Sequence, residues 1–199
     1  PWIRSLRCAR AAGSFSRVRT FTAASVFPMN EVLNALKQRR SVRAYEDRQV
    51  PDALLDAVLE AGLYAPTGMN TQKVVMVAVR DPETVRQLAQ MNAAVMGSDA
   101  DPFYAAPCVI VVLSDPEVRT WVENGSLVLG NLMNAAHALG LGSCWIHRAK
   151  EVFDTSEGKA LLRKWGLPDT LRGVGNCILG FPVTIPDPRP RLDGRIVKV

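Results

Sequence analysis

No apolar run in this 199-residue sequence approaches the roughly 18 residues that a membrane-spanning helix needs, so we expect no membrane partner. Histidine is nearly absent: with only His137 and His147, a zinc site would need Cys144 and His147 plus distant ligands, so we expect no metal. Cysteine is scarce, and the wide spacing of the thiols is typical of a reduced intracellular protein rather than a disulfide scaffold; they are Cys8, Cys108, Cys144 and Cys177.

The motifs of several common enzyme sites are missing too. Gly173 and Gly175 are followed by glycine only at Gly180, so the dinucleotide fingerprint Gly-x-Gly-x-x-Gly is absent. Neither a Walker phosphate loop nor a Gly-x-Ser-x-Gly nucleophile turn is present. These absences argue against a Rossmann-type dinucleotide site, a P-loop site and a serine hydrolase.

Acidic residues are missing from the first 30 positions, which hold five Arg and no Lys. Residues 31–199 carry 19 basic and 19 acidic side chains, so the net charge of +5 belongs entirely to the first segment. The body of the chain is therefore electrically balanced, and we expect no nucleic-acid partner.

Residues 1–28 form an Arg-, Ser-, Thr- and Ala-rich leader that we expect to lack ordered structure. Such a composition is typical of a mitochondrial presequence. Alternatively, Met29 is the true start and the preceding residues are read-through of upstream DNA. The first interpretation places the protein in mitochondria and the second in the cytoplasm, which we favour. In both cases the folded domain is expected to span residues 29–199.

Hydrophobic patterning predicts helices and short buried strands that alternate along the chain. The expected helices lie at about residues 30–38, 51–62, from 82 onward, 123–139 and 156–165, with Asp81-Pro82-Glu83 and Asp115-Pro116-Glu117 as helix starts. The expected strands are residues 74–79, 108–113, 143–146 and 174–179, and the proline-rich tail from Pro182 is expected to be extended. This pattern predicts one α+β domain, a helix–sheet–helix sandwich.

Four segments carry the chemical signal. Residues 39–43, Arg-Arg-Ser-Val-Arg, form a compact anion receptor after the first helix. Residues 65–72, Ala-Pro-Thr-Gly-Met-Asn-Thr-Gln, form a turn whose amides suit a flat heterocycle with N–H and C=O edges. Residues 131–145 connect an apolar helix to a buried strand, and residues 178–191 end in a stiff arm with two Arg. Each segment alone also fits a solvated turn, a loop or a core element.

In this order and spacing, the four segments resemble the FMN-dependent nitroreductase family in its short form, from about Met29 to the C-terminus. The resemblance implies a homodimer of α+β subunits that holds FMN in two pockets at the dimer interface. It also implies ping-pong hydride transfer from NADH or NADPH, through flavin N5, to nitroaromatics, quinones and related small-molecule acceptors.

The resemblance assigns cofactor-binding roles residue by residue. Arg39 and Ser41 would hold the FMN phosphate and ribityl chain, with Arg40 beside them. Arg43 would lie near the pyrimidine edge, where a positive charge stabilises the reduced flavin. Three further groups would complete the site: Pro66, Thr67, Gly68, Met69, Asn70 and Gln72 along the isoalloxazine from the partner subunit; the backbone of Trp145, Ile146 and His147 beside N5; and Arg189 and Arg191 over the phosphate.

Two positions depart from the family pattern, and both bear on acceptor preference. Lys73 and Val74 stand where the family often has Pro-Trp, and His147 stands where many short members have Gly. The chemistry belongs to FMN, so we expect no catalytic acid, base or nucleophile. Two alternatives stay open: a flavin dehydrogenase or oxidase acting on another substrate, and a flavin-binding protein without turnover.

Overall fold

The computed structural model describes residues 30–199; the expected leader lies outside the described residues. The helices are α1 (Glu31–Gln38), α2 (Asp52–Leu63), the short 3-10 helix η1 (Gly68–Asn70), α3 (Pro82–Met96), α4 (Trp121–Ala138), α5 (Ala149–Asp154) and α6 (Ser156–Lys164). The strands are β1 (Val74–Val79), β2 (Cys108–Ser114), β3 (Gly142–Ile146) and β4 (Arg172–Gly180).

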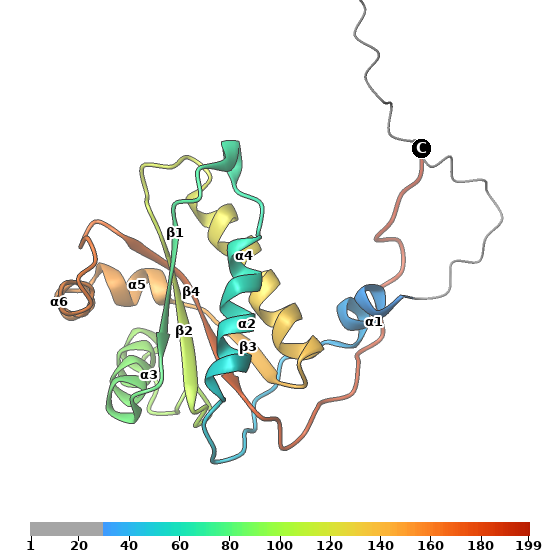
Figure 1. Cartoon of the computed structure of the whole chain (residues 1–199), viewed down its shortest axis with the longest axis horizontal. Coiled ribbons are helices and arrows are strands. Elements are labelled where there is room, and N and C mark those ends of the chain that lie inside the picture. Colours follow the sequence, from blue (N-terminus) through green and yellow to red (C-terminus); the bar gives the residue numbers. More distant parts are fainter. Residues whose placement is uncertain (1–29) are drawn as a thin grey trace, which may run out of the picture. The chain divides into compact units, whose positions relative to one another are not determined.

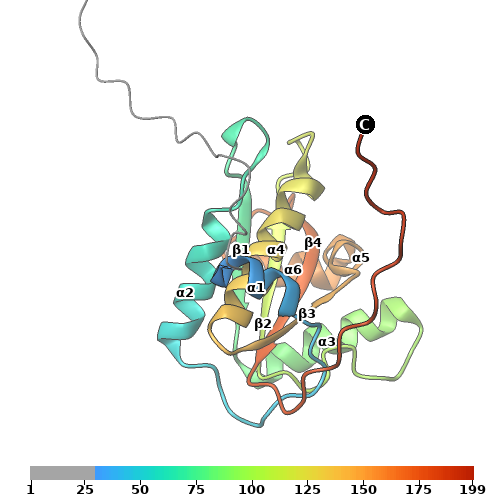
Figure 2. The same ribbon diagram turned by 90° about the vertical axis from the view of Figure 1, so that its right-hand side faces the viewer.

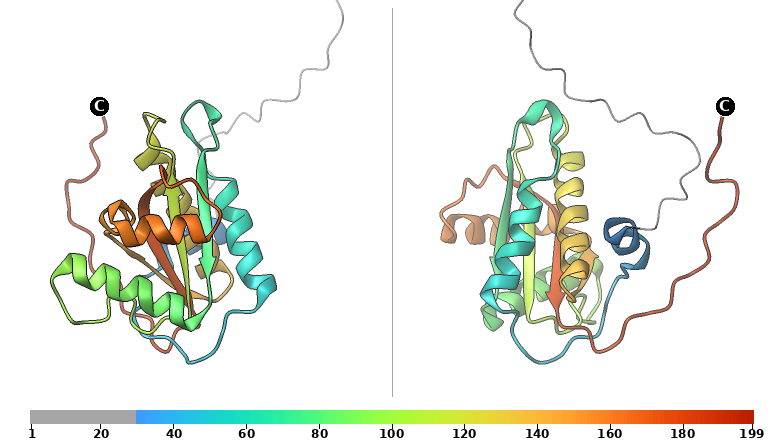
Figure 3. Two further views of the ribbon diagram at one scale, coloured as in Figure 1. Left: turned by 90° about the vertical axis from the view of Figure 1, so that its left-hand side faces the viewer. Right: turned by 45° about the vertical axis from the view of Figure 1, so that its right-hand side comes forward.

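The four strands form one antiparallel sheet in the order β1-β2-β4-β3. Every residue of β2 is buried, because the strand is central and both faces of the sheet are covered by helices. Cores on the two faces are separate: α2 and α4 pack on one face, and α3, α5 and α6 pack on the other (Figures 1 and 3). The predicted helix–sheet–helix α+β sandwich is confirmed.

Local sequence signals locate most elements correctly. The Asp81 carboxylate accepts a hydrogen bond from the Thr84 N–H at 2.9 Å, which confirms the predicted start of α3. The predicted helix start at Asp115 is wrong, because Asp115 instead closes a turn by accepting the Glu117 N–H, and α4 begins at Trp121. The short helix α5 was not predicted.

The two ends of the described chain differ from the rest in exposure. None of the residues of α1 is buried, although the helix lies beside α4 (Figure 2). Residues 183–199 are exposed and form no helix or strand, which confirms the predicted extended tail. Across residues 30–199, no helix has the length and apolarity needed to cross a bilayer.

Candidate functional site

The basic segment at residues 39–43 lies along the free edge of the sheet. Strand β3 is an edge strand, and Ser41 forms a parallel bridge with Ser143 near its start. The Val42 N–H donates to the Ser143 carbonyl oxygen at 3.0 Å. A Cβ atom at Gly142 would lie only 2.8 Å from Val42 Cγ1, so glycine permits this close approach. The sheet therefore fixes the backbone of the predicted anion receptor.

Two guanidinium nitrogen atoms of this segment are buried without a partner. They are Arg39 Nη1 and Arg40 Nε, and no described carboxylate forms an ion pair with either residue. Arg40 Nη1 instead donates to the Lys37 and Arg39 carbonyl oxygens, each at 2.7 Å. Buried charged donors are normally paired, so these two nitrogen atoms have unused capacity for an anion.

The same two arginines create a positive potential at the end of α4. Desolvation lowers the pKa of His137, and the positive charges of Arg39 and Arg40 lower that pKa further. Arg39 and Arg40 are therefore close enough to the C-terminal turn of α4 to act on His137.

Arg43 is exposed and faces an aromatic ring. Its Cζ atom lies 5.8 Å from the centroid of the Tyr104 ring, a cation–π distance. Tyr104 adopts the left-handed region with φ of 53°, as does Ala105 with φ of 52°. A strained turn of this kind needs support from its surroundings, which here comes from Asp101 Oδ2 accepting the Ala105 N–H at 2.7 Å.

The predicted heterocycle-binding turn is a tightly bonded loop before β1. Met69, Asn70 and Gln72 all have positive φ values, between 51° and 53°. The Gly68 N–H donates to Asn124 Oδ1 of α4 at 2.9 Å, and the Gln72 Nε2 donates to Asn70 Oδ1 at 3.0 Å. Three left-handed residues in one short loop are less favourable locally, and the hydrogen bonds to Asn124 and Asn70 offset this cost.

This loop presents its tip to solvent. Met69 is 95% exposed, and Pro66, Asn70 and Gln72 are also exposed, whereas Thr67 and Gly68 are half-buried. Lys73, which departs from the family pattern, has a structural contact in this chain. Its Nζ pairs with Asp115 Oδ2 at 2.9 Å and connects the loop to the residue after β2.

The basic segment and the loop lie at opposite ends of the sheet. Ser143, beside Ser41, pairs with Leu179 near the end of β4. Val74, next to the loop, pairs with Ser114, which pairs with Arg172 at the start of β4. A single chain therefore does not bring these two predicted parts of the site together (Figure 1).

Strand β3 ends in the third predicted part of the site. The Trp145 side chain packs with the α2–α4 core and the Ile146 side chain with the opposite core, so both side chains are structural. His147 is exposed. Alternation along an edge strand directs the backbone groups of Trp145 to the same free edge as those of Ser143. Binding of the flavin by the backbone of this stretch stays a prediction.

Arg189 and Arg191 are exposed on the C-terminal tail. The base of the tail is anchored: the Phe181 carbonyl oxygen accepts the Glu46 N–H at 2.9 Å, and the Val183 N–H donates to the Ala44 carbonyl oxygen at 3.0 Å. Beyond this point the tail runs clear of the sheet (Figure 3). The structure places the start of the tail beside the basic segment but does not bring the two arginines onto Arg39.

Sequence reasoning missed several residues that shape these segments. Asn124 supports the loop, Tyr104 faces Arg43, and Asn92 donates to the His147 carbonyl oxygen at 2.8 Å. The only sequence signal is a polar amide inside an apolar helix, at Asn92 and Asn124, both of which are buried. A cavity of about 600 Å³ between α3 and residues 99–107 contains none of the predicted site residues.

Comparison with known proteins defines the class to which this fold belongs. The model of the Nitroreductase family matches residues 36–99 and 96–181. A nitroreductase from Bacteroides fragilis, crystallised with bound FMN, has a TM-score of 0.79 and 31% identity, and the match covers 85% of this chain and 99% of that one. The fold is therefore a nitroreductase fold.

Two relatives extend the match through sequence. A Methanothermobacter thermautotrophicus protein, named as a candidate NADH dehydrogenase/NAD(P)H nitroreductase, is 30% identical over 168 residues, covering 82% of this chain and 83% of the relative. The Bacillus subtilis FMN reductase [NAD(P)H] is 26% identical over 181 residues, covering 82% and 71%. The chain belongs to the nitroreductase family.

Proposed function

We propose that this protein is an FMN-dependent oxidoreductase that passes hydride from NAD(P)H to a small-molecule acceptor such as a nitroaromatic or a quinone. Family membership supports the reaction class. The Bacteroides fragilis structure with bound FMN and the Bacillus subtilis FMN reductase support the cofactor and the reductant. The second candidate is a flavin carrier, a protein that binds FMN without catalysing turnover. Steady-state kinetics separate the two candidates.

The unpartnered guanidinium nitrogen atoms carry the assignment of the cofactor to this chain. Arg39 Nη1 and Arg40 Nε are buried without a partner beside the half-buried Ser41. A phosphate monoester is doubly charged and supplies several acceptor oxygens, which these donors need. The residues present therefore fit the phosphate end of FMN.

The proposed enzyme is a homodimer in which each flavin contacts both subunits. The basic segment and the 66–72 loop lie at opposite ends of one sheet, so one flavin cannot contact both within a single chain. In a homodimer, the 66–72 loop of the second copy can lie against the β3 edge of the first, so that one flavin contacts both segments. Exposed apolar side chains on α4 and α1 give such a copy surface to bury, among them Leu127 at 47% and Val32 at 67% exposure.

FMN, when bound, supplies reversible two-electron hydride chemistry at its N5 atom. The chain's own residues bind and orient it. Arg39, Arg40 and Ser41 hold the phosphate and ribityl end, Arg43 places positive charge near the pyrimidine edge, and the backbone at residues 145–147 borders the ring. Arg189 and Arg191, on the extended tail, would complete the phosphate site. No side chain is assigned as an acid or base.

The proposed FMN-binding domain spans residues 29–199, and we place the protein in the cytoplasm, or in mitochondria if residues 1–28 direct import. Every proposed binding residue follows Met29. Removing residues 1–28 should therefore leave flavin content and NAD(P)H oxidation unchanged. Loss of flavin from the truncated protein would show that the leader belongs to the functional domain.

Steady-state kinetics of the FMN-loaded protein test the proposal. With NADH or NADPH varied against a quinone or a nitroaromatic, a shared site for donor and acceptor gives parallel double-reciprocal lines. The matched control Arg163→Ala changes an exposed residue that pairs with the likewise exposed Asp169, and the variant should behave as wild type. FMN binding with no turnover on any acceptor would favour the carrier, and no FMN binding would contradict the proposal.

A further inference from the structure

Asn92 is a buried amide that reaches a backbone group far away in the sequence. Its side chain is fully buried on α3, and its Nδ2 donates to the His147 carbonyl oxygen at 2.8 Å. His147 directly follows β3, at the edge where the proposed flavin site lies. The bond therefore connects the α3 layer to the backbone of the site.

The turn that receives this bond is held from several directions. Ile146 pairs with Asn176 of β4, which fixes the end of β3. Arg148 adopts the left-handed region with φ of 74°, although it has a side chain. A Cβ atom at Gly173 would lie 2.3 Å from the Ala149 backbone, so β4 presses directly on the next residue. A strained residue persists only where its surroundings determine it in this way.

The bond to His147 also fixes the direction of a free donor. The His147 carbonyl and the Arg148 N–H belong to one trans peptide, in which the two groups point in opposite directions. Because Asn92 holds the carbonyl toward α3, the Arg148 N–H points away from α3. No acceptor takes this N–H within residues 30–199. The turn thus offers a pre-oriented donor that the protein itself leaves unused.

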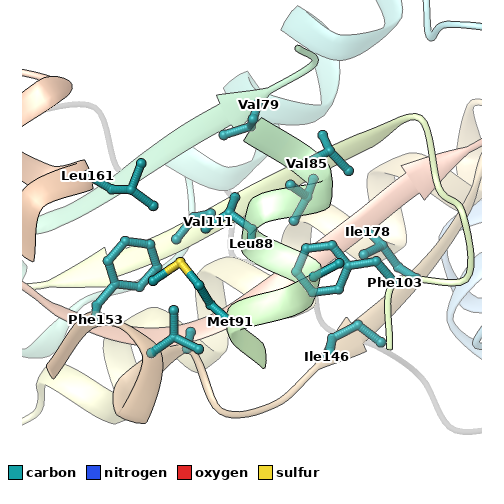
Figure 4. Packing of buried hydrophobic residues seen from close by; sticks show 14 of the residues in the cluster. Val79, Val85, Leu88, Met91, Phe103, Val111, Ile146, Phe153, Leu161 and Ile178 are labelled. Carbon is teal, nitrogen blue, oxygen red and sulfur yellow. The ribbon is translucent and has the colours of Figure 1, made fainter. Parts of the chain in front are cut away.

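Packing alone does not account for an amide at this position. Asn92 lies next to Met91 in a helix whose buried face is otherwise apolar, and Figure 4 shows Leu88 and Met91 among the residues of this core. Asn92 Oδ1 has no hydrogen-bond partner in the described structure. A buried amide with one unsatisfied oxygen lowers stability relative to a well-packed apolar side chain. The hydrogen bond that Asn92 donates to the His147 carbonyl therefore accounts for the amide better than packing does.

We propose that Asn92 is a positioning residue that holds the peptide between His147 and Arg148, so that the Arg148 N–H donates to an acceptor atom at the edge of the bound flavin. The inference rests on the proposed function. A carbonyl oxygen at the ring edge gains negative charge when the flavin is reduced, so an N–H aligned with that oxygen binds the reduced form more strongly. Without Asn92 the peptide is free to turn, and this differential stabilisation is lost.

The reduction midpoint potential of the bound FMN tests this role, measured by equilibration with a reference dye. Asn92→Leu keeps the branched shape with a larger side chain and removes the donor, and Asn92→Ala removes the donor with a smaller side chain, so a shift common to the two reports the lost hydrogen bond rather than a change of volume. We expect the preference for reduced over oxidised FMN to fall about tenfold, a lowering of about 30 mV for a two-electron couple. FMN affinity and the melting temperature of the cofactor-free protein are measured in parallel.

Val85→Ala is the matched control, because Val85 is a buried residue of the same helix and lies about two turns before Asn92. It should lower the melting temperature and leave the potential at the wild-type value. An unchanged potential in both Asn92 variants, or an equal shift in Val85→Ala, would overturn the inference while leaving the proposed function intact. A wild-type protein that binds no FMN would overturn the proposed function and this inference with it.

Discussion

Arg39 combines two properties that rarely occur together, a buried guanidinium nitrogen and no carboxylate partner. In a protein without an anionic ligand this arrangement is unfavourable, because a buried charged donor loses its hydration without compensation. A bound phosphate supplies the missing acceptors. At the scale of single residues, the anion site is therefore indicated by buried donors without acceptors rather than by a cavity.

Replacing either proposed phosphate ligand should weaken FMN binding. A hydrogen bond to a charged group contributes roughly 1.5–3 kcal/mol, so we expect Arg39→Ala to raise the FMN dissociation constant about tenfold or more, and Arg191→Ala to act in the same direction. Flavin fluorescence titration measures both constants, with Arg163→Ala as the exposed control. If neither variant changes the dissociation constant, the phosphate assignment is wrong.

His137 provides a second, independent probe of the same charges. Burial and the nearby Arg39 and Arg40 lower its pKa from the usual value of 6.5, so the imidazole stays neutral in the folded protein at pH values where it is protonated in the unfolded chain. Unfolding then takes up a proton, and the stability that this residue contributes is lost as the pH falls below about 6.5.

Binding of a phosphate should raise this pKa, because the anion offsets the charges of Arg39 and Arg40. We expect the His137 imidazole resonance in a proton NMR titration to move its midpoint to higher pH when FMN is added. His147 is the only other histidine, so the two signals are easily assigned with a His147→Gln variant. A midpoint that stays the same with bound FMN would place the phosphate elsewhere.

At the scale of elements, periodicity and capping predicted the four strands and most helices, because those signals are local. The start at Asp81 is correct and the start at Asp115 is wrong for one reason: the same carboxylate can cap a helix or close a turn. Only the tertiary contact decides, and here Asp115 also binds Lys73. Helix α5 is too short, at six residues, to show a period.

The candidate site likewise has parts that the sequence predicts and parts that only the tertiary structure shows. The basic segment and the loop are recognisable because their residues are adjacent in the sequence. The supporting hydrogen bonds, from the Gly68 N–H to Asn124 and from Asn92 to the His147 carbonyl, span 56 and 55 residues, so no short sequence window contains both partners. Strand order, which sets the distance between the two segments, is likewise a tertiary property that the pattern left undetermined.

Adding a single methyl group at Gly173, where β4 contacts the start of α5, should destabilise the protein. In Gly173→Ala the added Cβ would meet the Ala149 backbone at 2.3 Å, and backbone cannot yield as a flexible side chain does. We expect a loss of roughly 1–3 kcal/mol in the free energy of unfolding. Thermal or urea unfolding of the cofactor-free protein measures it.

Gly130→Ala is the control for this substitution. Gly130 lies in α4, and no described atom beyond its own stretch of helix lies within 4 Å of an added Cβ, so the higher helix propensity of alanine should leave stability unchanged or raise it by up to about 1 kcal/mol. A Gly173→Ala protein as stable as Gly130→Ala would show that α5 is not pressed against β4.

At the scale of the whole molecule, the separation of the two segments predicts a shared site. One chain with Arg39→Ala and another with Asn70→Ala should each lose flavin affinity as homodimers. In a mixed dimer, both substitutions fall on one flavin site and the other site is intact, so about half of the wild-type flavin binding should return. Co-expression with two affinity tags gives the mixed dimer, and its flavin content is the measurement.

Absence of recovery in the mixed dimer would show that both segments serve a flavin in the same chain, against the strand order described above. Light scattering of the FMN-loaded wild type at micromolar concentration gives the supporting mass. A monomer in that measurement would contradict the homodimer directly.

The central claim is that the chain binds FMN in a form that NAD(P)H can reduce. Anaerobic titration of the purified protein with NADH, and separately with NADPH, followed through the flavin absorbance bands, tests it most directly. We predict about one FMN per chain and complete bleaching by one equivalent of reductant, with the bands restored on adding a quinone. A protein without flavin after reconstitution, or a bound flavin that neither nicotinamide bleaches, would contradict the account.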